Sequence, residues 1–264
     1  MVDDGVVYRK GPKGQRVPVR RQFADDFEDA KVMRDLVGLE RGWTHFTLLS
    51  PKASTIPEYN ALRKRILEGG DFLDNRIELS GEQARSGRTS LRCYSVPATS
   101  EMVTAKALLE TTLLHFVKGD DVWFSGWFFV RADSPMPSTL MDLETTWLNV
   151  HPGIRIFVFG GQYLGMELKW FPKPKYRQPP GKEVAFPRGR WVHVKVHLKL
   201  SDGRDGVVEL WQDGAQIGHE SGQTLPMADS IYNSLQVGIT AHGHDSLPAV
   251  LFVDDVQISD QPIE

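Results

Sequence analysis

Residues 188–212 constrain the fold most strongly, because apolar and polar side chains alternate over the nine residues from 192 to 200. Aliphatic residues occupy every second position, namely Val192, Val194, Val196, Leu198 and Leu200. The positions between them hold His193, Lys195, His197 and Lys199. A period of two predicts a β-strand with one face in an apolar core and the other in water or in a groove, whereas a helix would scatter the same residues around its axis.

A second strand follows at 207–211, after a turn over 201–206 that is rich in Gly and Asp. It ends at Asp213-Gly214, a dipeptide typical of tight hairpin turns. We assign Trp191 and Trp211 of this hairpin to the core. The hairpin predicts an antiparallel β-sandwich, against which the rest of the chain can be compared.

From residue 76 onward nearly the whole chain has the character of short strands. The candidates are 76–80, 88–95, 103–109, 121–131, 138–145, 153–159, 163–170, 190–200, 206–212, 233–240 and 249–258. Residues 171–182 are rich in Pro and Lys and are predicted to form a loop, because proline cannot donate to a sheet ladder. No repeat of fixed period is present. The pattern predicts an all-β fold, a two-sheet antiparallel jelly-roll sandwich.

The first part of the chain differs in character from the rest. Residues 1–22 are polar and basic, and are predicted to form an arm that is mobile or laid on the surface, with a polyanion-binding tail as the alternative. Residues 23–264 are then one jelly-roll domain. A small helical insertion is expected at about 30–70, with a helix over 59–67 that stops at Gly69-Gly70.

Composition excludes several classes of protein. The chain has 264 residues and a net charge of −3, so no overall field favours nucleic acid. No apolar run approaches the roughly 20 residues that a membrane span needs. With Cys93 as the single cysteine, an intrachain disulfide is ruled out. The first residues lack the pattern of a signal peptide, and we expect an extracellular or periplasmic protein from which a signal has been removed, with a cytoplasmic protein as the alternative.

Several segments resemble a known fold family. SGRTSLRCY at 86–94 and DDVWFSGWFFV at 120–130 resemble core strands of concanavalin A-like jelly rolls. The segment 186–214, with SLQVGIT at 234–240 and VLFVDDVQIS at 250–259, is similar to heparinase-like polysaccharide lyases. The resemblance covers about 76–260 and implies a carbohydrate-active protein. It does not carry over the family's catalytic residues, because LMDLETTW at 140–147 and ITAHGHD at 239–245 replace the expected segments.

Two carboxylates lie two residues apart on a predicted strand, so that Asp142 and Glu144 point to the same face. The segment LMDLE also resembles the E-x-D-x-E strand of jelly-roll β-glucanases, except that Leu140 stands at the position of the nucleophile. A glycoside hydrolase using Asp142 and Glu144 is therefore one hypothesis. The alternative is that both are hydrogen-bonded or solvated polar groups.

A lyase requires other groups. Arg92 or Arg155 would neutralise a uronate carboxylate, and Tyr163 or His242 would handle the proton. His242 and His244 lie beside Asp245 and could also begin a metal shell, or belong to an ordinary loop.

Groups suited to binding a polysaccharide are also present. If the polar face of the 190–200 strand lines a concave sheet, its His and Lys side chains suit an acidic sugar chain, and if it lies on the convex outer face it is simply solvated. Aromatic rings stack on sugars, although most tryptophans belong to cores. The expected substrate-binding residues are His193, Lys195, His197, Lys169, Trp147, Trp170 and His244.

A structural calcium ion is a further expectation. In concanavalin A-like sandwiches the first and last strands often hold Ca²⁺ through carboxylates and carbonyls, and hard oxygen ligands suit that ion. The matching candidates are Asp26, Glu28, Asp254, Asp255 and the carbonyl of Gly87. The alternative is a set of acidic residues at strand ends.

The leading hypothesis is a protein that binds a polysaccharide, anionic in character, in a concave β-sheet groove and cleaves it by β-elimination. A non-catalytic glycan-binding or adhesion module and a glycoside hydrolase are the alternatives.

Overall fold

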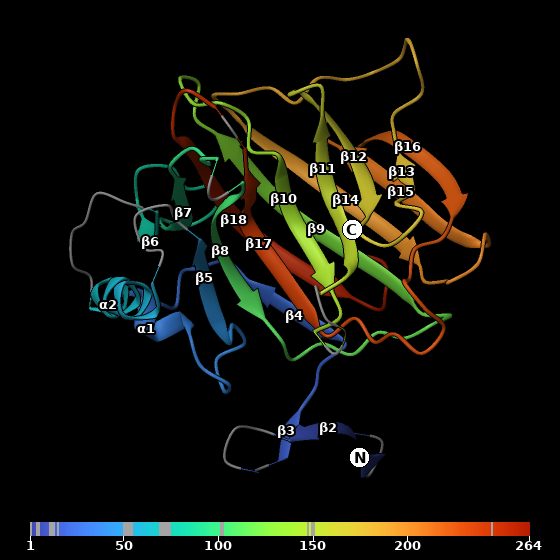
Figure 1. The fold of residues 1–264 in the computed structure, drawn as a ribbon, viewed down its shortest axis with the longest axis horizontal. Helices are drawn as coiled ribbons and strands as arrows, with labels where there is room; N and C mark the ends of the chain where they lie inside the picture. The colour runs from blue at the N-terminus through green and yellow to red at the C-terminus, as the bar shows by residue number, and fades with distance from the viewer. Residues whose placement is uncertain are drawn as a thin grey trace.

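The computed structural model describes residues 2–3, 6–10, 14, 16–49, 55–68, 75–100, 103–146, 148, 151–243 and 245–264. Two large antiparallel sheets form the body of the protein (Figure 1). The predicted all-β, two-sheet sandwich is confirmed, because the described strands of each sheet pair with antiparallel register throughout.

One sheet has seven strands in the order β13-β12-β11-β10-β17-β8-β5. Its strands are β5 His45–Leu49, β8 Ala105–Thr111, β10 Thr139–Glu144, β11 Gly153–Phe159, β12 Tyr163–Leu168, β13 Lys175–Tyr176 and β17 Ser234–His242. Strands β10 to β13 follow one another in sequence, whereas β17, β8 and β5 come from distant parts of the chain, so the sheet collects residues from most of the chain.

The other sheet has eight strands in the order β16-β15-β14-β9-β18-β7-β6, with β4 added beside β18. Its strands are β4 Gln22–Asp25, β6 Arg76–Ser80, β7 Ser90–Ser95, β9 Asp121–Val130, β14 Trp191–Lys199, β15 Gly206–Gln212, β16 Ala215–Gly222 and β18 Ala249–Ser259. The strand with the strict alternation, β14, lies between β15 and β9.

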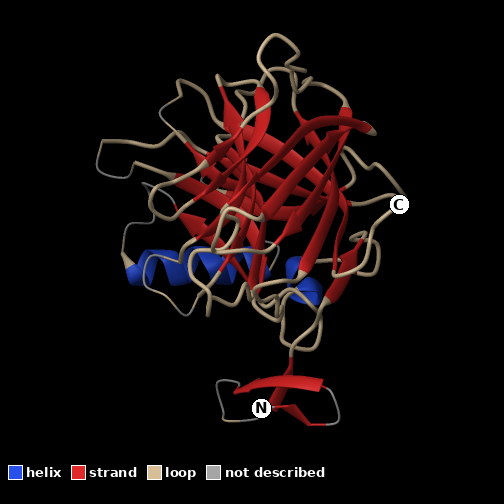
Figure 2. Ribbon diagram, turned by 90° about the vertical axis from the view of Figure 1, so that its right-hand side faces the viewer, coloured by secondary structure: helices blue, strands red, loops and turns tan. Residues whose placement is uncertain are grey.

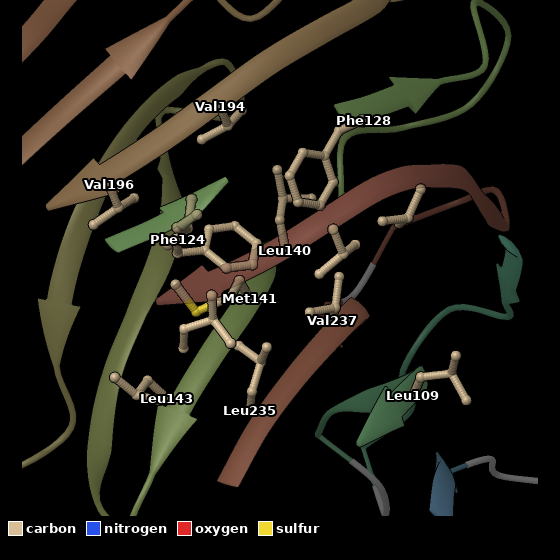
Figure 3. Packing of buried hydrophobic residues seen from close by; sticks show 14 of the residues in the cluster. Leu109, Phe124, Phe128, Leu140, Met141, Leu143, Val194, Val196, Leu235 and Val237 are labelled. Atoms are coloured by element: carbon tan, nitrogen blue, oxygen red, sulfur yellow. The ribbon is translucent and has the colours of Figure 1, made fainter. Parts of the chain in front are cut away.

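The core lies between the two sheets. The aliphatic side chains of β14 are buried, as their period of two predicts, and Phe124 and Phe128 of β9 project beside them. Figure 3 shows Val194, Val196, Phe124 and Phe128 on one side of the core, with Met141 and Leu143 of β10 on the other. Alternation therefore leaves the opposite face of each sheet free for polar side chains.

Trp211 does not belong to this core, contrary to the prediction. It pairs with Lys195, whose ammonium lies 5.3 Å from the centre of the indole, and it is only half-buried. Since Val194 and Val196 point inward, their neighbour Lys195 and its partner must point outward.

The helices lie together at one side of the sandwich, against β6 (Figures 1 and 2). They are α1 Met33–Leu36 and α2 Ile56–Leu67. Helix α2 begins at a capping box in which Thr55 and Glu58 bind each other's backbone N–H groups, and it buries Leu62 and Ile66. The insertion also contains β5, an edge strand that the sequence pattern did not reveal.

Strands β16 and β13 were also missed. Asp213, with φ of 50°, and Gly214, with φ of 81°, form a tight turn into β16. The sequence of β16, AQIGHESG, lacks most of the bulky residues that are typical of strands. The proline-rich segment contributes the two-residue edge strand β13, and proline is tolerated only at such edges.

The N-terminal residues form a small sheet of their own, β1 Val2–Asp3, β2 Val6–Lys10 and β3 Arg16–Pro18. This sheet lies apart from the sandwich (Figures 1 and 2). Among the described residues, no helix is long and apolar enough to cross a bilayer.

The packing of Leu143 against the opposite sheet gives a test of this core. Leu143 is 1% exposed, so Leu143→Ala should lower the free energy of unfolding by about 2–5 kcal/mol through the cavity that it leaves. Ile56→Ala, at a side chain that is 77% exposed, should change it by less than about 0.5 kcal/mol. Urea denaturation of both variants measures the contrast, and equal effects would contradict the assigned core.

Candidate active site

A row of polar side chains crosses the seven-stranded sheet on the face turned away from the core. Strand pairing places one residue from each strand side by side, in the order His45, Glu110, Gln236, Asp142, Arg155, Glu167 and Lys175. Their neighbours along the strands, such as Met141 and Leu143, are buried in the core. Because alternate residues face opposite ways, the whole row lies on one face.

Lys169, just beyond the end of β12, lies at the centre of this row. Its Nζ atom is 2.7 Å from Asp142 Oδ1 and also forms an ion pair with Glu144 Oε1. Burial alone would lower the pKa of Lys169, but the two carboxylates raise it overall, so the ammonium stays charged. Burial raises the pKa of Glu144, against the pull of Lys169. The side-chain amide of Gln236 donates to Glu144 Oε2 over 2.9 Å.

A second ion pair joins the neighbouring strands β11 and β12. Arg155 Nε donates to Glu167 Oε2 over 2.9 Å, and Lys175 Nζ lies 3.6 Å from Glu167 Oε1. The Arg155 guanidinium also lies over the ring of Phe157, 5.3 Å from its centre.

The far end of the row holds an imidazole. His45 Nε2 is 2.9 Å from Glu110 Oε2, and the hydroxyl of Ser234 donates to the other oxygen of Glu110 over 2.6 Å. His45 Nδ1 lies 2.9 Å from the Thr44 hydroxyl. Burial alone would raise the pKa of Glu110, but its bond to His45 and the charge of that ring lower it below the ordinary value.

In each of these pairs the basic partner is more exposed than the acid. The side-chain exposures are 20% for Lys169 against 2% for Asp142, and 24% for Arg155 against 8% for Glu167. For His45 and Glu110 they are 35% and 6%. The carboxylates therefore lie beneath a layer of donors, which presents N–H groups to any molecule that approaches this face.

Four of the predicted catalytic and binding residues are thus brought together, namely Asp142, Glu144, Arg155 and Lys169. The row also contains five that the sequence reading missed, namely His45, Glu110, Gln236, Glu167 and Lys175. The missing signal is register: only the pairing of strands that are distant in sequence shows that these residues are neighbours.

Tyr163 and Trp170 lie near the row without joining it. Tyr163 is on the same face of β12 as Glu167, four residues away, which is about 13 Å along a strand. Trp170 is partly buried against the core. Trp147 and His244 lie outside the described residues.

Four other predicted residues are on the opposite side of the sandwich, on the outer face of the eight-stranded sheet. Arg92 Nη1 binds Glu78 Oε1 over 2.6 Å. His193 Nε2 lies 2.7 Å from the Ser125 hydroxyl, and Lys195 donates to the carbonyl of Ile263 over 3.2 Å.

The last of the four, His197, lies between two carboxylates, 2.7 Å from each of Asp121 and Glu209. These side chains share no face with Asp142, so the two predicted groups do not form one site.

His242 is fully buried near the end of β17. Its Nε2 lies 3.2 Å from the carbonyl of Leu247, and its Nδ1 is 3.7 Å from Asp245 Oδ2. Burial lowers the pKa of His242, which favours the neutral ring. Its place in the core of the fold separates it from the charged row.

The residues predicted to hold calcium instead fix a loop. Asp254 Oδ2 accepts from the backbone N–H of Arg85 over 2.8 Å, and Asp255 Oδ1 accepts from the Ser86 hydroxyl over 2.7 Å. Burial raises the pKa of Asp254 to about 6.

Glu28 Oε1 accepts from two N–H groups of the same loop, and a Cβ on Gly87 would lie 2.3 Å from its carboxyl carbon. Asp26 Oδ1 accepts from the backbone N–H of Glu28 over 3.1 Å. The described residues contain no group of three or more potential ligands around one point. Calcium binding by these residues stays a prediction from the sequence.

The His45–Glu110 pair gives a prediction about pH. The pKa of Glu110 is lowered from 4.5, so the ionised carboxylate stabilises the fold above about pH 4.5, and this contribution is lost as the pH falls through the folded-state pKa. Glu110→Gln should therefore cost about 1–3 kcal/mol near pH 6 and much less near pH 3. Urea denaturation at both pH values measures this.

Glu40→Gln, at an exposed carboxylate, is the matched control and should change the stability little at either pH. A cost of Glu110→Gln that stays the same from pH 6 to pH 3 would contradict the stabilising role of the ionised carboxylate.

A sequence profile described as polysaccharide lyase matches residues 58–257. No curated protein sequence matches the chain.

Solved structures share the fold at low identity. An endo-β-1,4-glucuronan lyase from the fungus Trichoderma reesei is 12% identical with a TM-score of 0.57, over 83% of this chain and 91% of its own. The cellulose induced protein Cip1 is 16% identical with a TM-score of 0.58, over 91% and 98%. The alginate lyase Aly36B, as a mutant in complex with alginate trisaccharide, is 10% identical with a TM-score of 0.56, over 92% and 100%. The resemblance expected from the sequence is therefore confirmed.

Proposed function

The chain belongs to the polysaccharide lyase family, and from this premise we propose that it cleaves a uronate-containing polysaccharide by β-elimination on the charged row of the seven-stranded sheet. The layer of exposed donors above buried carboxylates carries this proposal. An anionic sugar chain meets the N–H groups of Lys169 and Arg155 and the imidazole of His45, while the acids beneath hold those groups in place. Glucuronan and alginate, named for two structures of the same fold, are polymers of this class.

The reacting sugar lies over β17 in this proposal. The imidazole of His45 contacts Glu110 of β8, and the ammonium of Lys169 contacts Asp142 and Glu144 of β10. Strand β17 lies between them, so their contact points are two strand spacings apart, about 10 Å. This gap suits one sugar ring. Gln236 lies beneath it, and its side-chain oxygen is buried without a hydrogen-bond partner among the described residues.

In the proposed reaction Lys169 and Arg155 act as donors and His45 acts as the base. Lys169 and Arg155 bind the uronate carboxylate and stabilise the negative charge that develops when the adjacent carbon loses its proton. The imidazole of His45, held by Glu110 at Nε2, takes that proton at Nδ1, where the sugar replaces the contact with the Thr44 hydroxyl. The electron pair forms the carbon–carbon double bond, the bond to the glycosidic oxygen at C4 breaks, and the leaving oxygen takes a proton from solvent. The product is an unsaturated uronate.

A glycoside hydrolase using Asp142 and Glu144 is less well supported. Both carboxylates bind the same ammonium and are almost fully buried, so neither is placed to donate a proton to a glycosidic oxygen or to attack the sugar. A hydrolase would release reducing ends without the near-ultraviolet absorbance of an unsaturated product. We also propose that the protein acts outside the cytoplasm, where polymers of this class are found.

Replacing the donors tests the proposal. His45→Gln and Arg155→Gln should each lower kcat/KM on polyglucuronate or alginate by about 100-fold or more, because each removes a group that acts in the transition state. Lys169→Arg, which keeps the charge between the two carboxylates, should retain the fold and lose much of the activity. The absorbance of the unsaturated product is the measurement.

The matched controls are His193→Gln and Arg190→Gln, an imidazole and a carboxylate-bound guanidinium on the other sheet. They should change kcat/KM by no more than about twofold. Equal losses in both sets would place the activity elsewhere, and activity retained by His45→Gln would remove His45 from the mechanism.

A further inference from the structure

A pocket of about 660 Å³ opens at the edge of the sandwich, where the β11–β12 hairpin, β13 and β16 meet. Phe159, Tyr163, Leu164, Pro179 and Pro180 give it apolar walls, and most of the remaining lining is charged or polar. Such a combination of rings and a few fixed polar groups is typical of ligand pockets. The mechanism proposed above uses none of these residues.

The pocket is continuous with the charged row through Lys175. This residue lines the pocket, and its Nζ atom also lies 3.6 Å from Glu167 in the row. Strand β13 is three strands from β10, about 14 Å from Asp142. A polymer that is bound across the sheet over the row would therefore reach this pocket with a sugar beyond the reacting one.

Arg177 is the group in this pocket that still lacks an anion. Its guanidinium lies over the ring of Phe159, 4.6 Å from the centre, and has no carboxylate partner among the described residues. Two acids also line the pocket, and one oxygen of each binds the backbone: Glu220 Oε1 accepts from the N–H of Arg177 and Glu183 Oε2 from that of Gly181. Among the described residues, neither forms an ion pair with the Arg177 guanidinium.

The hydroxyl of Tyr163 likewise has no hydrogen bond to a described residue. A guanidinium spread on an aromatic ring keeps its N–H edge free to bind a carboxylate with two parallel bonds. Beside it, the ring of Tyr163 offers a face for a sugar and its hydroxyl a partner for a sugar hydroxyl.

We propose that this pocket is a distal subsite for a second uronate residue of the same polysaccharide, with Arg177 binding its carboxylate and Tyr163 contacting its ring. The inference rests on the proposed function and adds a dependence on chain length to it. An oligosaccharide long enough to reach from Lys169 to Arg177 binds more tightly than a shorter one, whereas the rate of the bond-breaking step is the same for both.

The experiment compares full-length wild type, Arg177→Gln and Tyr163→Phe on oligoglucuronates and alginate oligosaccharides of two to eight units. Arg177→Gln should raise KM for the longest oligosaccharides about tenfold, the value of one charge-assisted contact, and leave kcat unchanged. The KM for the shortest substrate that is cleaved should stay as in wild type. Tyr163→Phe should show a smaller shift in the same direction, and Arg177→Lys should recover part of the loss.

Arg204→Gln, at an exposed arginine in the turn before β15, is the matched control and should follow wild type at every length. A KM for Arg177→Gln that equals wild type at all lengths, or a loss of kcat for the shortest substrate, would overturn the subsite.

The failure of the proposed function is recognised separately. If wild type yields no unsaturated product from either polymer, the same oligosaccharides are titrated calorimetrically into wild type and Arg177→Gln. Weaker binding by Arg177→Gln then supports the subsite and removes only the chemistry. Equal affinities, or no binding to either protein, would overturn the subsite as well.

Discussion

The pairing of buried carboxylates with more exposed bases is the interaction on which this structure depends. An unpaired ionised carboxylate at 2% exposure would be very costly, so Asp142 requires the ammonium of Lys169 beside it. In the same way, Glu167 requires Arg155 beside it and Glu110 requires His45. Each acid thereby fixes the position of one donor, and the donors form a preorganised surface for an anion. The acids contribute by holding the bases, whereas the bases contact the sugar.

This arrangement is possible only with the observed strand register. Met141 and Leu143 fill the core while Asp142 and Glu144 point to the other face. A slip of one residue in β10 would place both carboxylates among the aromatic rings of the opposite sheet and both aliphatic side chains in the row. The hydrophobic core and the charged row are thus two consequences of one alternation, and stability of the first maintains the geometry of the second.

Much of the fold could be predicted from the sequence, because alternation and turn residues are local signals. Strands β6, β11 and β15 have the expected boundaries or differ by one residue, and the hairpin turn at 213–214 was recognised. The site could be predicted only in part. Alternation separates the two faces of β14 but does not say on which sheet they lie, so His193 and Asp142 seemed compatible with one groove. His45 lay in a segment expected to be helical, and its place beside Glu110 follows from pairing across 65 residues of chain.

The proposed mechanism places the reacting sugar above β17, between Lys169 and His45. A crystal structure of the His45→Gln variant with a bound oligoglucuronate tests it most directly. We expect the carboxylate of one sugar within hydrogen-bond distance of Lys169 and Arg155, with the ring over Gln236. An oligosaccharide bound instead on the outer face of the eight-stranded sheet, beside His193 and Lys195, would contradict the account.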